Sequence, residues 1–163
     1  MTDHHQVQLR KAGHVFCAGH FITLSDDVCE PVHGHNWTVG VDLEGSPDPH
    51  GMVIDFIALR DALKSVTEQL DHFMLLPTEH PTIKVRADER EVLVTFEDRR
   101  WIFPRCDCVL LPLANTTAEL LARWIGQRLL EELSRRLGVS PSRLQIAVDE
   151  DNGQWGQCEL VNA

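Results

Sequence analysis

A strand that begins with two histidines is the strongest constraint on how this chain folds. Apolar and polar residues alternate without a break over residues 35–44. The apolar positions are Trp37, Val39, Val41 and Leu43. This alternation predicts a half-buried strand, which needs a packing layer over its apolar face. Because side chains two residues apart in a strand point to the same side, His33 and His35 should project together at the start of this strand.

Two imidazoles at this spacing suit two ligands of one metal ion. His20 ends a preceding interrupted strand predicted over residues 6–20, and it reaches the same ion if the two strands pair antiparallel across the loop 21–32. Three neutral imidazoles with an open fourth position are typical of a catalytic zinc. The alternative is that His-Gly-His is an ordinary loop sequence and His20 an unrelated surface residue, and the spacing alone favours that alternative.

The rest of the chain predicts two helices and further strands. Asp55 can cap a helix with apolar residues at helical spacing up to residue 70, and Thr116 with Glu119 forms a capping-box pattern that begins a second helix ending at Gly138. Residues 83–103 hold two β-prone runs around a polar ADER segment, which predicts a hairpin, and residues 144–161 predict another. The fold class is therefore α+β with an antiparallel sheet.

Charge and cysteine content narrow the class of function. The 25 acidic residues outnumber the 15 lysines and arginines, giving a formal net charge of -10. This charge disfavours nucleic acid and acidic membranes as partners, and a small molecule is the expected ligand. Five cysteines without a regular framework argue against a disulfide-stapled secreted domain. With no signal-peptide pattern and no apolar run of membrane-spanning length, a cytoplasmic location is expected.

Other residues near the histidines carry possible chemistry. Cys29 lies four residues before His33, where it could be a metal ligand, a base, or an ordinary buried cysteine. Asp71-His72 follows the first predicted helix and could form a proton relay, although a bare dipeptide means little. Glu150 continues the apolar face of the strand that starts near residue 144, so its carboxylate should turn inward and needs hydrogen-bond donors.

Five motifs in this order resemble the 6-pyruvoyl-tetrahydropterin synthase and 6-carboxy-tetrahydropterin synthase family. They are FCAGH, CEPVHGHNWTVGVDLEG, GMVIDF, LDH and NTTAELLARW. The resemblance covers residues 14–75 and 112–160. It implies the tunnelling fold, in which a four-stranded antiparallel sheet carries two helices on one face. It further implies one domain over residues 1–163 and homo-hexamers, built as dimers of trimers, with active sites between subunits.

The resemblance also implies a role for each matching residue. Zn²⁺ would be bound by His20, His33 and His35. Cys29 would be the proton-abstracting thiolate, and Asp71-His72 its relay. Glu150 would grip the amino edge of the pterin, and the remaining pocket segment would be Thr116, Thr117 and Glu119. The implied substrate is 7,8-dihydroneopterin triphosphate, and the favoured product is 6-carboxy-5,6,7,8-tetrahydropterin. The alternatives are a 6-pyruvoyl-tetrahydropterin synthase and a pterin-binding protein without turnover.

Two departures from the family pattern stand out. The chain carries an insertion, predicted to contain the hairpin, from about residue 79 to 111, which could cover the pocket or alter assembly. Glu30 follows Cys29, giving Cys-Glu-x-x-His-Gly-His. The cysteine resembles the queuosine-branch enzymes and the glutamate a folate-branch variant. Together they resemble a dual-function subgroup that also forms 6-hydroxymethyl-dihydropterin, with Glu30 as a second catalytic residue; the alternative is that Glu30 is a solvated loop carboxylate.

Overall fold

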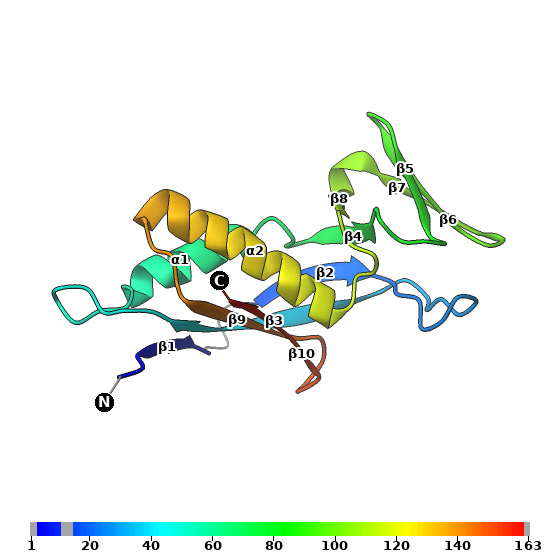
Figure 1. Cartoon of the computed structure of the whole chain (residues 1–163). Coiled ribbons are helices and arrows are strands. Elements are labelled where there is room, and N and C mark those ends of the chain that lie inside the picture. The colour runs from blue at the N-terminus through cyan, green and yellow to red at the C-terminus, as the bar shows by residue number, and fades with distance from the viewer. Residues whose placement is uncertain (1–2, 11–14, 162–163) are drawn as a thin grey trace.

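The computed structural model describes residues 3–10 and 15–161. In this part of the chain the α-helices are α1 (Phe56–Thr67) and α2 (Ala118–Leu137), and both lie on one face of the larger sheet (Figure 1). Asp55 caps α1 as predicted, because its Oδ1 accepts a hydrogen bond from the backbone N–H of Ala58 at 2.8 Å. Neither helix is long and apolar enough to cross a membrane. The α+β class is confirmed.

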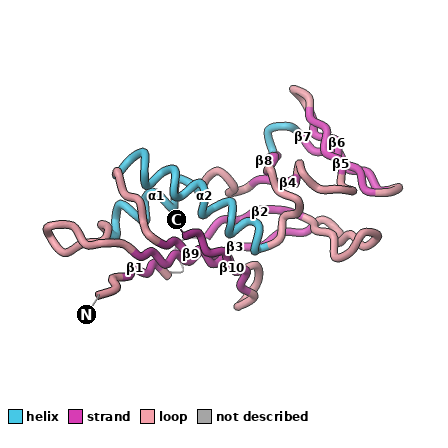
Figure 2. The backbone as a smooth tube through the Cα atoms, viewed as in Figure 1, coloured by secondary structure: helices cyan, strands magenta, loops and turns pink. Residues whose placement is uncertain are grey.

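The larger sheet of the described residues has seven strands. They are β1 (Gln6–Leu9), β2 (Val15–His20), β3 (His33–Glu44), β4 (Phe73–Pro77), β8 (Cys108–Leu111), β9 (Arg143–Asp149) and β10 (Trp155–Val161). Their order is β10-β9-β3-β2-β4-β8, and β1 also pairs with β3. The strands from β10 to β2 are antiparallel, whereas β4 runs parallel to both β2 and β8. Figure 2 shows β1, β3, β9 and β10 beneath the helices, and β4 and β8 to one side, toward the small sheet.

The prediction of a four-stranded antiparallel sheet is therefore wrong, because the sheet is mixed and larger. The added strand β4 contains the continuous apolar run from Met74 to Leu76, which is buried. Parallel strands covered on both faces give such runs instead of an alternating pattern, so periodicity does not reveal them. The single strand predicted over residues 6–20 is described as β1 and β2, with residues 11–14 outside the described residues.

The apolar face of β3 is the centre of the main core. Its four apolar side chains are fully buried, as the alternation predicted. They pack in one cluster with the inward residues of both helices, among them Leu59 and Leu63 of α1 and Leu121 and Ile125 of α2. The histidines at the start of β3 share this face, so they lie where the core reaches the end of the sheet.

Residues 84–104 form a separate antiparallel sheet of three strands, β5 (Lys84–Ala87), β6 (Glu91–Phe96) and β7 (Arg99–Pro104). The hairpin predicted around the ADER segment corresponds to β5 and β6, and the structure divides the second predicted run into β6 and a further strand, β7. A short 3₁₀ helix, η1 (Arg105–Asp107), leads from β7 to β8. Figure 1 shows the three strands at the end of the molecule toward which the loop after β2 also projects. The description of the chain as a single domain with an insertion at about 79–111 stays a prediction.

The small sheet packs on a second apolar cluster. Val92, Val94 and Phe96 of β6 are buried together with Phe21, which directly follows β2. Cys29 packs against the same cluster. The inserted strands and the loop between β2 and β3 therefore share one core.

Polar contacts fasten the same loop at Thr23. The Nδ1 atom of His80 accepts hydrogen bonds from the backbone N–H groups of Thr82 and Ile83, at 3.0 and 2.9 Å. The ring proton is therefore on Nε2, which lies 2.8 Å from the Thr23 hydroxyl and donates to it. On the other side, the Asn115 side chain donates to the Thr23 carbonyl at 3.1 Å. The loop is thus held by one residue at the start of the insertion and one that follows it.

Candidate functional site

Three histidines and one glutamate meet at the end of the sheet. In the pairing of β2 with β3, His20 stands opposite His33. The ring centroids of His20, His33 and His35 lie 4.7 to 5.2 Å apart. Their candidate ligand atoms and one oxygen of Glu150 all lie within 4.8 Å of one another. The structure brings together the three imidazoles that the sequence predicted as metal ligands.

His20 is oriented so that a lone pair faces the cluster. Its Nδ1 lies 2.9 Å from the backbone carbonyl of Thr116, and because a carbonyl only accepts, Nδ1 carries the proton. Burial lowers the pKa of His20 to about 4, and the two neighbouring imidazoles act in the same direction against the bond to Thr116. The ring is therefore neutral near pH 7, and Nε2 has only a lone pair to offer.

This lone pair points at a negative group. Nε2 of His20 lies 3.2 Å from Oε1 of Glu150, and Nε2 of His35 lies 3.6 Å from the same oxygen. Both nitrogens are buried and have no hydrogen-bond partner among the described residues. A buried acceptor such as Nε2 of His20 is unfavourable next to a carboxylate unless a cation lies between the two groups. The donor set fits a divalent metal ion.

His33 adds a third acceptor from the loop side. Its Nδ1 lies 2.8 Å from the carbonyl of Pro31, so the same reasoning assigns the proton to Nδ1 and a lone pair to Nε2. This Nε2 lies 3.8 Å from Oε2 of Glu30. Backbone carbonyls that fix the ring nitrogen opposite the metal are the usual support of zinc-bound histidines.

Glu150, which was predicted to bind the pterin, lies next to the histidines themselves. Its side chain is 24% exposed and turns inward, as the strand pattern predicted. Burial raises the pKa of Glu150, the imidazoles oppose this change, and the nearby carboxylates of Glu30 and Glu119 add to it. The structure therefore places three acidic side chains around one edge of the imidazole cluster.

Thr116, in the segment before α2, contacts the imidazole cluster through a hydrogen bond to His20. Thr116 is fully buried, and its hydroxyl donates to the carbonyl of Phe21 at 3.2 Å while its own carbonyl accepts from His20. The predicted capping box is wrong, because the N-cap is Thr117 and the Thr116 hydroxyl is used elsewhere. Glu119 stands in the first turn of α2 and is exposed.

Cys29 and Glu30 lie on the loop between β2 and β3, and Glu30 reaches the edge of the cluster at His33. The thiol of Cys29 donates to the carbonyl of Glu30 at 3.5 Å. Burial raises the pKa of this thiol, and the positive charge of Arg99 opposes the change. Arg99 belongs to β7, and nothing in the sequence distinguished it from its neighbour Arg100. Only the pairing of distant segments reveals its position.

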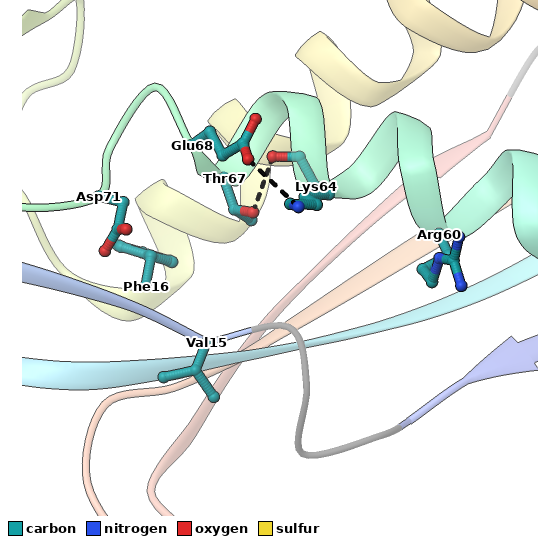
Figure 3. Close-up of a pocket in the computed structure, with 7 residues that line it drawn as sticks. All are labelled: Val15, Phe16, Arg60, Lys64, Thr67, Glu68 and Asp71. Carbon is teal, nitrogen blue, oxygen red and sulfur yellow. Dashed lines mark hydrogen bonds and ion pairs between the residues drawn. The ribbon is translucent and has the colours of Figure 1, made fainter.

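Asp71 and His72 form a pair away from the imidazoles. Oδ1 of Asp71 accepts from the backbone N–H of Cys17 at 2.8 Å and lies 3.0 Å from Nδ1 of His72. Figure 3 shows Asp71 beside Phe16 at the rim of a pocket next to α1. Cys17 precedes His20 by three positions, which is about 10 Å along a strand. The His72 ring is 81% exposed, so this pair is free to face a second molecule.

Comparisons with known proteins identify the family to which this fold belongs. A model of the 6-pyruvoyl tetrahydropterin synthase family matches residues 9–160. A Pyrococcus abyssi protein, provisionally named 6-carboxy-5,6,7,8-tetrahydropterin synthase, is 32% identical over 147 residues, covering 90% of this chain and 86% of that protein. The crystal structure of Plasmodium vivax 6-pyruvoyl tetrahydropterin synthase has a TM-score of 0.91 at 26% identity and covers 99% of this chain and 100% of its own.

A second structure of the P. vivax protein, with a TM-score of 0.90, carries alanine in place of a glutamate described there as catalytic. The fold and the site together define a class of protein: α+β proteins in which three histidines and a glutamate meet at the end of the sheet. The family match over nearly the whole chain makes the assignment more specific. This chain belongs to the 6-pyruvoyl tetrahydropterin synthase family.

The geometry predicts about one zinc ion per subunit, held by His20, His33 and His35. Replacing His33 or His35 with alanine should reduce bound zinc well below that ratio, because a ligand is lost. The measurement is metal analysis after extensive dialysis, and His50→Ala, in an exposed loop, is the matched control. Stoichiometric zinc in either ligand variant would show that the ion binds elsewhere.

Proposed function

We propose that this protein is a zinc-dependent lyase that converts 7,8-dihydroneopterin triphosphate to 6-carboxy-5,6,7,8-tetrahydropterin. The observation that carries the proposal is the cluster of lone pairs from His20, His33 and His35 beside the carboxylates of Glu30 and Glu150. Family membership supports the pterin substrate. The name of the P. abyssi relative supports the carboxy product.

The residues around the cluster have different proposed roles in the reaction. Bound zinc supplies Lewis acidity, which makes a coordinated side-chain hydroxyl of the substrate more acidic. The Cys29 thiol, once it has lost its own proton, would remove a proton from a substrate carbon. Because burial raises its pKa, this thiol needs a nearby positive charge to become a thiolate near neutral pH.

Glu30 offers a second base on the same loop. Its carboxylate lies at the rim of the cluster, where Oε2 is 3.8 Å from Nε2 of His33. A carboxylate suits removal of a hydroxyl proton, which leads to retro-aldol cleavage of the side chain and a hydroxymethyl product. The catalytic glutamate of the P. vivax protein supports a catalytic role for a glutamate in this family. Formation of 6-hydroxymethyl-dihydropterin is therefore the second candidate activity.

The product assay tests both activities. Zinc-loaded protein incubated with 7,8-dihydroneopterin triphosphate should yield 6-carboxy-tetrahydropterin, identified by mass. Cys29→Ala should reduce this product by about 100-fold or more, the usual effect of losing a general base, while sparing some hydroxymethyl product. Glu30→Ala should have the reverse effect. Both variants are compared at equal zinc occupancy.

Each outcome of this assay has a distinct meaning. Pyruvoyl product alone would assign the 6-pyruvoyl activity instead. Pterin binding without any product would indicate a protein that kept the pocket and lost turnover. If Glu30→Ala changes neither the rate nor the product ratio, Glu30 is a solvated loop residue and Cys29 is the base that remains.

Glu119 and Glu150 are proposed to bind different parts of the substrate. Glu150 faces His20 and His35, so its carboxylate would lie beside the side chain of a pterin bound at the cluster. Glu119 is exposed and lies three residues after Thr116, the residue that orients His20. Its free carboxylate can accept two hydrogen bonds from the amino edge of the ring. This division moves the ring-binding role predicted for Glu150 to Glu119, with Thr117 beside it.

Paired glutamine variants separate these roles. Glu119→Gln should weaken the binding of neopterin, measured by fluorescence titration, by about tenfold or more, as expected for loss of charge-assisted hydrogen bonds. Glu150→Gln should leave neopterin affinity within a few-fold and lower the turnover rate. The opposite pattern would return the ring-binding role to Glu150. Zinc content and unfolding temperature serve as controls for both proteins.

We also propose that Asp71 and His72 act in the site of a neighbouring subunit. Within one chain they lie beside Cys17, away from the imidazole cluster, and His72 is held in an exposed position with a φ of 65°. The pair already has relay geometry, since the Asp71 carboxylate lies 3.0 Å from the ring it would orient. A homo-hexamer built as a dimer of trimers would supply this partner.

Mixing inactive variants tests the shared site. Subunits carrying Cys29→Ala and subunits carrying His72→Ala should each have little activity. If each site draws the two residues from different subunits, random mixed oligomers should recover about a quarter of wild-type activity. The control pairs Cys29→Ala with His33→Ala, which belong to one subunit's share and should give no recovery. No recovery in demonstrated mixed oligomers of the first pair would place the relay in a single chain or outside the reaction.

A further inference from the structure

The inserted sheet reaches the loop that carries the two proposed bases. Arg99 is the first residue of β7, and its Nη1 donates to the carbonyl of Cys29 at 2.7 Å. Its Nη2 donates to the carbonyl of Glu30 at 3.1 Å. One planar guanidinium therefore holds two consecutive carbonyls, a geometry that a lysine ammonium does not reproduce.

Arg99 is itself fixed by aromatic contacts. Its guanidinium carbon lies 4.7 Å from the ring centroid of Trp101, within the range of a cation–π interaction. Trp101 in turn stacks on Phe21, with centroids 4.7 Å apart and planes 26° apart. Phe21 is fully buried and follows His20 directly in the chain. Arg99 is thus positioned, through Trp101, against the segment that contains His20 and Phe21.

The carbonyl of Glu30 links Arg99 to the chemistry of Cys29. This oxygen receives both the thiol proton of Cys29 at 3.5 Å and the Nη2 donor of Arg99 at 3.1 Å. When the thiol gives up its proton, its hydrogen bond to the carbonyl is lost and a negative sulfur faces a carbonyl oxygen. The guanidinium continues to satisfy the carbonyl and adds a positive charge nearby. The loop can therefore keep its shape with Cys29 in either protonation state.

We propose that Arg99 is a positioning residue, supplied by the insertion, that holds Cys29 and Glu30 in their working geometry beside the metal cluster. This inference rests on the proposed function, since it assigns the insertion a role in that same site. The outer face of β7 carries Arg100, which is exposed and stands opposite Thr95. Neighbouring arginines on opposite faces of one strand thus provide a test residue and its matched control.

The experiment compares Arg99→Ala, Arg99→Lys and Arg100→Ala in the zinc-loaded full chain. With dihydroneopterin triphosphate, Arg99→Ala should lower kcat by about 10- to 100-fold, the scale of a misplaced catalytic group, while KM changes far less. Arg99→Lys should recover part of kcat, because it keeps the charge but not the two-carbonyl grip. Arg100→Ala should behave as wild type. Equal kcat and equal product ratio for Arg99→Ala and wild type would overturn the proposal.

A second readout does not depend on turnover. Alkylation of Cys29 by iodoacetamide is followed across pH by mass spectrometry of its peptide, with exposed Cys106 as the internal reference. Loss of the guanidinium should move the midpoint for Cys29 to higher pH and leave Cys106 unchanged, and an unmoved midpoint in Arg99→Ala counts against the proposal. If wild type forms no product, the proposed function fails while this readout still decides the role of Arg99. If Arg99→Ala does not fold, the same comparison of kcat and midpoint is made with Arg99→Gln, which also removes the charge, at wild-type zinc content.

Discussion

The register between β2 and β3 is the constraint on which the site depends. It sets His20 opposite His33, and a slip of one residue would turn His20 to the other face of the sheet. Trp37 helps to fix this register, because its ring stacks on Phe16 at 5.9 Å and its indole N–H donates to the carbonyl of Ala18 at 3.3 Å. The same ring packs edge-on against His20. The core residue Trp37 and the imidazole cluster therefore both depend on the pairing of β2 with β3.

The polarity of the cluster explains why the fold tolerates buried histidines at all. The Nδ1 atoms of His20 and His33 each face a backbone carbonyl, which assigns the ring proton to Nδ1 and leaves the lone pair of Nε2 toward the cluster. Glu150 adds negative charge to this group of acceptors in a chain already at -10. Such an arrangement costs stability in the absence of a cation and becomes favourable with one. Folding and metal binding are therefore coupled at this end of the sheet.

The parts of the fold predicted from sequence are those with a local signal. Alternation identified β3 and its buried face, and His-x-His at its start identified the ligand pair. The strand β4 has no alternation because it is covered on both faces, and Arg99 looks identical to Arg100 until β7 is placed against the loop. The Thr116 pattern misled because its hydroxyl bonds a distant carbonyl in preference to its own helix. These errors share one cause: each of these features depends on contacts between segments that are far apart in the sequence.

The loop between β2 and β3 connects these observations. It is held at Thr23 by His80 and Asn115, and at Cys29 and Glu30 by Arg99, whereas its own backbone supplies only short-range bonds such as Glu30 N–H to the carbonyl of Ile22. Two of these holding residues lie in or beside the inserted strands. The inserted strands pack on the second apolar cluster, which also contains Phe21, the residue that directly follows His20. The insertion and the loop therefore share one core, separate from the main one, and the stability of the inserted sheet contributes to how firmly the two proposed bases are held.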